Sequence, residues 1–187
     1  MTKSRERPLA EAEEVRSQYL TFEIGGEEYA MQILRVREII EYQPLTKVPK
    51  MPGWVRGVIN LRGVVVPVID LALVFRQQAT IPGKRTCIII TEVTGSSSET
   101  VMGVLADSVR QVVEWSSEEI EEPPSFGTQI KIEYLLGMGR NGDRFSLILD
   151  SDRLLSIDEL LELQTSITAP AGGEVEGKVD DERNSPE

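Results

Sequence analysis

Short runs in which apolar and polar residues alternate dominate the chain. Residues 19–24 alternate with a period of two, and Gly25-Gly26 follow them as the turn of a hairpin. Apolar runs at 64–69, 87–91 and 145–149 have the composition of further strands. Pro67 has no backbone donor, so we expect its strand to lie at a sheet edge or to carry a bulge. The pattern predicts a mostly β protein.

Helix signals are confined to two places. Residues 31–35 predict a short helical turn before the strand-like residues 36–42. A clearer helix begins at Ser156, because Ser156 and Glu159 have capping-box spacing and leucines follow on one face. We expect this C-terminal helix to pack on the β units and to end the fold.

The chain repeats part of itself. In the aligned segments Gly57 meets Gly137 and Asp70 meets Asp150. Two similar β units of about five short strands follow from this repeat, and such units close as barrels that remove sheet edges. Each unit is small for an independent core, so we expect a shared interface with a binding groove between the units. The aligned segments are 28–40 with 101–113 (an offset of 73 positions) and 54–74 with 134–154 (an offset of 80).

Composition divides the chain into one structured region and two tails. Residues 1–17 mix charges of both signs, and residues 166–187 are small, polar and poor in side chains that could fill a core, so we expect a flexible N-terminal tail and a disordered acidic C-terminal tail. The region 18–165 then holds the two pseudo-repeated units, roughly 18–82 and 83–165.

Charge and hydropathy narrow the partners and the compartment. The net charge of −11 disfavours nucleic acid and anionic lipid as partners. No segment approaches the roughly 20 apolar residues that span a bilayer, and residues 1–17 do not resemble a signal peptide. The single cysteine, Cys87, lies in an apolar run where we expect it to be buried and inert. We expect a cytoplasmic protein.

Candidate catalytic chemistry is sparse. The chain has no histidine and one cysteine, which removes the usual general base and any His- or Cys-based zinc site. Asp70 and Asp150 resemble the paired carboxylates of aspartic proteases, but the residues around them lack the flanking Thr-Gly, and capping of a turn explains them better. The glycines at 137, 139 and 142 precede a strand, so they predict a tight turn and no nucleotide site. We expect no cofactor, no metal and no enzyme activity.

Two charged residues interrupt apolar runs. Arg62 lies in or beside the tight turn Asn60-Leu61-Arg62-Gly63, and Glu38 is flanked by Val36, Ile39 and Ile40. Arg62 is explained if its turn is exposed to solvent, and Glu38 is explained if its strand has one solvated face. The alternative is that Arg62 is a planar charged contact for a partner.

The region from about Gln18 to Leu163 resembles the CheW family of chemotaxis coupling proteins. Its longest matching stretch, residues 57–71, is specific, unlike the glycine pattern. The residues that carry the resemblance are Glu28-Tyr29, Ile33-Leu34, Val36 and Glu38-Ile39; residues 57–71 (GVINLRGVVVPVIDL); and residues 133–139 (EYLLGMG).

The resemblance implies two intertwined five-stranded SH3-like β-barrels, a C-terminal helix and short helical turns. It implies a non-catalytic scaffold that binds the regulatory domain of the histidine kinase CheA and the cytoplasmic tip of chemoreceptors, in the cytoplasm at membrane-associated receptor arrays. By resemblance, Gly57 and Phe126 belong to the kinase contact, although Glu121 stands where a basic residue is expected. The implied receptor-binding residues are Val36, Glu38, Ile39, Arg62 and Val109.

An adaptor of a non-flagellar chemosensory pathway, such as one serving pili or development, fits the same residues. The sequence does not separate these two roles.

Overall fold

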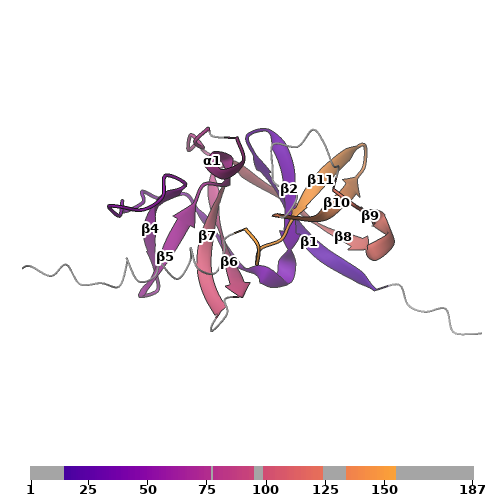
Figure 1. Ribbon diagram of the computed structural model, residues 1–187, viewed down its shortest axis with the longest axis horizontal. Coiled ribbons are helices and arrows are strands. Elements are labelled where there is room, and N and C mark those ends of the chain that lie inside the picture. The colour runs from indigo at the N-terminus through magenta and orange to yellow at the C-terminus, as the bar shows by residue number, and fades with distance from the viewer. Residues whose placement is uncertain (1–14, 77, 95–98, 124–133, 155–187) are drawn as a thin grey trace, which may run out of the picture.

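The computed structural model describes residues 15–76, 78–94, 99–123 and 134–154. These residues are mostly strand, with one short α-helix and two 3-10 turns (Figure 1). The strands are β1 (Arg16–Ile24), β2 (Glu27–Gln32), β3 (Val36–Glu41), β4 (Val55–Leu61), β5 (Val64–Ile69), β6 (Cys87–Thr94), β7 (Glu99–Ala106), β8 (Ser108–Ser116), β9 (Ile120–Glu121), β10 (Leu135–Asn141) and β11 (Arg144–Leu149); the helix is α1 (Leu71–Arg76), and the 3-10 turns are η1 (Ile33–Arg35) and η2 (Ser117–Glu119).

The strands form two sheets whose membership does not follow the two halves of the sequence. The six-stranded sheet has the order β8-β1-β2-β11-β10-β9, and the five-stranded sheet has the order β3-β6-β7-β5-β4. In Figure 1 the indigo β1 and β2 therefore lie with the orange β10 and β11. Residues 18–82 and 83–165 each contribute strands to both sheets, so the two halves are intertwined.

Two parallel pairings join the halves at equivalent positions. Val68 of β5 is the partner of Gly103 in β7, and Ile148 of β11 is the partner of Ala30 in β2. The offsets of 80 and 73 positions carry the first pair onto the second. The sequence repeat is therefore also a repeat of strand pairing.

The hydrophobic core has one shared part and a smaller part in each sheet. The shared cluster takes Phe22 and Met31 from the six-stranded sheet and Ile89 and Met102 from the five-stranded sheet. Tyr29 stacks on Phe22 and Phe75, with ring centroids 6.2 and 5.7 Å away. Burial of this apolar surface is the main term that holds the two sheets together. The expected shared interface is confirmed.

Local structure agrees with some sequence expectations and departs from others. Gly25 and Gly26 have φ angles of 59° and 84°, as the predicted hairpin turn requires. The helical turn predicted at 31–35 is present as η1, which covers Ile33–Arg35, whereas residues 31 and 32 end β2. The predicted C-terminal helix from Ser156 lies outside the described residues.

The position expected for Pro67 was wrong. β5 is an interior strand of its sheet, whereas an edge or a bulge at Pro67 was predicted. Pro67 pairs with Val58 of β4 on one side only, because the pairing of β5 with β7 begins at Val68. On the β7 side Pro67 therefore lies beyond the end of the ladder, where a missing backbone donor is tolerated.

Candidate partner-binding site

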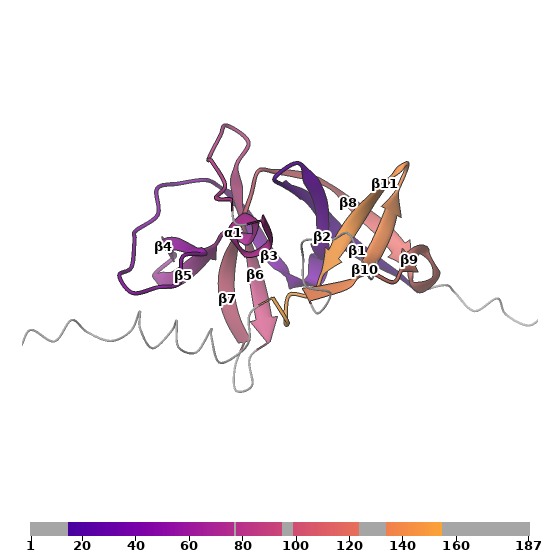
Figure 2. The same cartoon turned by 45° about the horizontal axis from the view of Figure 1, so that its top comes forward.

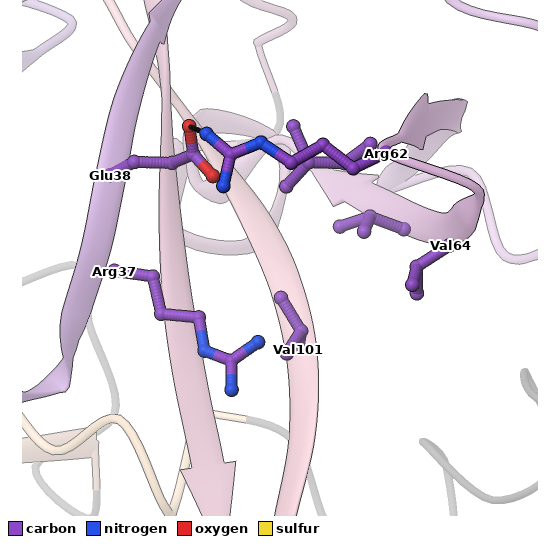
Figure 3. Close-up of a pocket in the computed structure, with 7 residues that line it drawn as sticks. Arg37, Glu38, Arg62, Val64 and Val101 are labelled. Carbon is purple, nitrogen blue, oxygen red and sulfur yellow. Dashed lines mark hydrogen bonds and ion pairs between the residues drawn. The ribbon is translucent and has the colours of Figure 1, made fainter.

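Glu38 and Arg62, far apart in sequence, form an ion pair across one face of the five-stranded sheet. Glu38 lies on β3, and Arg62 lies in the turn between β4 and β5. Arg62 Nη2 donates to Glu38 Oε2 over 2.9 Å. The two side chains point toward one another from opposite walls of a groove (Figure 3). Since the Arg62 side chain is 80% exposed, the pair adds little stability but displays both charges.

The turn that carries Arg62 is a strained two-residue hairpin loop. Arg62 and Gly63 have φ angles of 53° and 90°, and the Asn60 side chain accepts a 2.7 Å hydrogen bond from the Gly63 amide. Glycine or asparagine is the usual residue at such angles, and arginine is unfavourable there. A residue held in an unfavourable backbone conformation at an exposed turn is typical of a functional position.

We call the surrounding depression the hairpin groove. It has a volume of about 410 Å³ and mixes apolar walls with charged rims. Val66 is fully buried at its base, and Val64 is 57% exposed. Arg37, on the rim, is itself ion-paired with Glu92. The residues that line the groove are Arg37, Glu38, Leu61, Arg62, Val64, Val66 and Val101.

A second depression, the intersheet groove, lies between the two sheets. Its volume is about 510 Å³, and it brings β3 of one sheet against the start of β8 of the other. Ile39, which is 43% exposed, and Val109 both line it, as the expectation of a groove between the units requires. Burial raises the pKa of the Cys87 thiol at its base. The lining residues are Ile39–Glu41, Lys84–Cys87 and Ser108–Arg110.

The remaining predicted residues lie apart from the grooves. Val36 begins β3 and packs half-buried against the shared core. Gly57 has a φ angle of 148°, and a Cβ there would lie 2.5 Å from the Thr46 carbonyl oxygen. The close approach of Thr46 to β4 therefore requires glycine at this position. Phe126 lies outside the described residues.

Several residues that line the grooves were not predicted from the sequence. Leu61, Val64 and Val101 form apolar walls of the hairpin groove, and Lys84 and Arg85 form a basic rim of the intersheet groove. The apolar run 64–69 predicted a strand, and in that strand Val64 and Val65 are about half exposed. Only the position of that run, directly after a turn, signalled an exposed end.

The two aspartates suggested by the protease alternative serve their own turns. Asp70 is fully buried and accepts hydrogen bonds from Ala72 N, Thr80 N, Thr80 Oγ1 and Arg56. Asp150 accepts from Asp152 N and forms an ion pair with Arg153. These contacts fit the capping interpretation and give the protease alternative no support.

The described part of the chain shows neither a metal site nor a membrane-spanning helix. Within those ranges, no group of three or more His, Cys, Asp or Glu side chains is arranged to hold a metal ion. None of the helices found there has the length and apolar character needed to cross a membrane.

Two intertwined β units with open, part-apolar grooves between charged rims define a protein-binding scaffold. Comparison with known proteins agrees: the profile of the CheW-like domain matches residues 18–159. The chain belongs to the CheW-like family.

Named relatives lead to the same class. The chemotaxis protein CheW of Klebsiella aerogenes is 36% identical over 148 residues, covering 79% of this chain and 87% of the relative. That of Treponema pallidum is 32% identical over 160 residues, covering 83% and 91%. The crystal structure of the scaffolding protein TtCheW from Thermoanaerobacter tengcongensis matches with a TM-score of 0.69 and 27% identity, over 84% of this chain and 96% of that one. These findings support the function of a chemotaxis adaptor scaffold.

Proposed function

We propose that the chain is a non-catalytic coupling protein. It binds the cytoplasmic tip of chemoreceptors and the regulatory domain of the histidine kinase CheA, and is recruited from the cytoplasm to receptor arrays at the membrane. The observation that carries the proposal is that β3 contributes to both grooves: Glu38 to the hairpin groove and Ile39 to the intersheet groove. These residues belong to the set for which the family resemblance implies receptor binding.

Recognition of the receptor would follow helix-in-groove geometry. Apolar side chains on one face of a receptor helix fill the apolar parts of the grooves, and the charges at the rim fix the register. Glu38 and Arg62 suit that second task because their pairing orients both groups before the partner arrives. Val36 contributes indirectly, since its packing on the core holds the start of β3.

The kinase contact would lie on another part of the surface. Gly57 allows the Thr46 segment to pack directly on β4, so its contribution is to the shape of that end of the sheet. Phe126 would add an aromatic contact. Such contacts are individually modest, and many linked copies in an array make them effective.

Calorimetric titration tests the proposal. The full-length chain is titrated with a receptor tip fragment and, separately, with the CheA regulatory domain. We expect binding to both, with Arg62→Ala or Glu38→Ala weakening receptor affinity by about tenfold, or roughly 1.4 kcal/mol, while kinase binding is kept. Arg144→Ala is the matched control, because Arg144 is an exposed arginine beside the other hairpin turn.

Failure of both titrations with folded protein would refute the coupling role. Receptor binding unaffected by Glu38→Ala and Arg62→Ala would instead move the receptor site elsewhere. The alternative is an adaptor of a non-flagellar chemosensory pathway. Preference for the kinase of another chemosensory pathway in the same titration would favour that alternative.

A further inference from the structure

The sequence repeat gives every residue that lines the hairpin groove an equivalent position around the second hairpin, β10–β11. The offsets of 73 and 80 positions identify these equivalents, and strand pairing supports them. The hairpin β4–β5 shifts register between Val55 and Gly57, and the hairpin β10–β11 shifts between Leu135 and Gly137, at the same place in the repeat. The equivalents are Arg110 for Arg37, Gln111 for Glu38, Asn141 for Leu61, Gly142 for Arg62, Arg144 for Val64, Ser146 for Val66 and Glu28 for Val101.

The chemistry at these equivalent positions is reversed. Where the hairpin groove has the apolar Leu61, Val66 and Val101, the equivalent positions have an amide, a hydroxyl and a carboxylate. Where the hairpin groove has the Glu38–Arg62 ion pair, the equivalent positions have Gln111 and Gly142, which cannot form an ion pair. The two hairpins lie at opposite ends of the molecule (Figure 2), so the two equivalent positions are separate sites.

The polar side chains at the equivalent positions bond to one another. Glu28 Oε1 accepts from Asn141 Nδ2 over 2.9 Å and also from the Ser146 hydroxyl. Asn141 Oδ1 in turn accepts from Gln111 Nε2 over 3.3 Å. Ser146 is fully buried. The network thereby ties β2, β8 and the hairpin β10–β11 together at the place equivalent to the open hairpin groove.

We propose that the network of Glu28, Gln111, Asn141 and Ser146 is a plug that closes the second, equivalent groove, so that one chain docks one receptor element. An apolar side chain entering there would separate a part-buried carboxylate from its donors, and unmade buried hydrogen bonds are costly. The inference rests on the proposed function for the identity of the occupant, a helix that presents an apolar side chain to the hairpin groove.

Exchanging residues between the halves tests the plug. The closed variant carries Glu38→Gln, Leu61→Asn, Val66→Ser and Val101→Glu, which copies the plug into the hairpin groove. The opened variant carries hairpin-groove residues at the plug and at the neighbouring turn: Glu28→Val, Gln111→Glu, Asn141→Leu, Gly142→Arg and Ser146→Val. The Gly142 φ angle of 63° is close to the 53° of Arg62, so arginine there meets the same backbone as in the first half.

Calorimetric titration with the receptor tip fragment gives affinity and stoichiometry for each variant. We expect one fragment per wild-type chain, two per opened chain, and at least a tenfold loss of affinity for the closed chain. Val112→Asn, a polar change at an exposed valine outside the hairpin groove, is the control and should bind as wild type. A folded opened variant that still binds one fragment, or a wild type that binds two, would overturn the plug.

Two further readouts keep the test decisive. If the opened variant does not fold, the closed variant decides: folded protein with lost affinity supports the plug, and retained affinity overturns it. If the wild type binds no fragment, the proposed function fails, and the plug is judged by NMR alone. The plug is supported if the Asn141 side-chain amide exchanges slowly with solvent in the wild type and faster in Glu28→Val. Fast exchange in the wild type overturns the plug.

Discussion

At the residue scale, Arg62 places function and stability in opposition. Its φ angle of 53° costs a residue other than glycine about 1 kcal/mol, and its exposed ion pair with Glu38 returns between 0 and about 1 kcal/mol. Asparagine tolerates this conformation better than arginine. We therefore expect Arg62→Asn to leave the free energy of unfolding unchanged or to raise it by up to about 1 kcal/mol, while receptor affinity falls. Urea denaturation measures the first quantity and calorimetry the second.

Arg62→Val is the contrasting variant, because a β-branched residue at positive φ is a genuine outlier. It should lose the same receptor contact but lower the free energy of unfolding by about 1–2 kcal/mol relative to Arg62→Asn. Equal stability of the two variants would show that the turn carries no strain.

Cys87 offers a second test at this scale. The thiol is buried, 8% exposed, and burial raises its pKa, so its reactive thiolate form is scarce near neutral pH. We expect a disulfide reagent to label Cys87 at least about a hundredfold more slowly in the native protein than in denaturant. The raised pKa predicts that native labelling accelerates with increasing pH even above the range where a free thiol has already ionised. Rapid labelling of native protein would contradict the assigned burial.

Individual site residues were only partly predictable. Glu38 and Arg62 stood out because a charge inside an apolar run needs an explanation, and the structure brings these two side chains into contact. The basic rim formed by Lys84 and Arg85 gave no such signal, since charged residues near a turn are ordinary solvated surface. Its location became apparent only when the fold placed those residues beside β3 and β8.

At the scale of single elements, the buried Asp70 anchors α1 and the segment that follows it. Its carboxylate accepts from the Ala72 amide over 3.1 Å, from Thr80 N over 2.8 Å and from Arg56 over 2.8 Å. Removing it leaves buried donors and a partly buried guanidinium unpaired. We expect Asp70→Ala to lower the free energy of unfolding by about 3 kcal/mol, measured by urea denaturation.

The repeat supplies a matched control for that loss. Asp150 occupies the equivalent position and caps the same kind of turn, but its side chain is 16% exposed and its ion-pair partner, Arg153, is 68% exposed. Asp150→Ala should therefore cost only about 1 kcal/mol, in the range of a lost cap. Comparable losses at both positions would show that burial of Asp70 adds nothing to capping.

The helix α1 shows why some elements escape sequence patterns. Its six residues, LALVFR, follow the apolar strand β5 directly and share its composition, so no change of period separates the two. Asp70 was recognised as a cap, but for a turn and not a helix. The helix exists because Leu71 and Phe75 bury themselves in the shared core, a tertiary effect that overrides local propensity.

At the scale of the whole molecule, the sequence repeat predicted two similar units but did not predict that the two halves exchange strands. Both offsets are visible in the sequence because corresponding strands keep similar side chains. The residues of a strand do not indicate, however, which half of the chain supplies its neighbouring strand in the sheet. The pairings of β5 with β7 and of β2 with β11 span the two halves. Family resemblance, and not the pattern of apolar positions, led to the expectation of intertwined units.

This arrangement predicts that neither half folds alone. A fragment of residues 1–82 keeps β1 and β2 without β8 and β11, and keeps β5 without β7. It thereby exposes apolar residues of the shared core, such as Phe22 and Ile69, and leaves strand edges unpaired. We expect fragments 1–82 and 83–187 to give the narrow NMR amide dispersion of unfolded chains, whereas the full chain unfolds in one cooperative transition. Well-dispersed spectra from either fragment alone would mean that a half can close its own sheet, and that the exchange of strands is not needed for the stability of each unit.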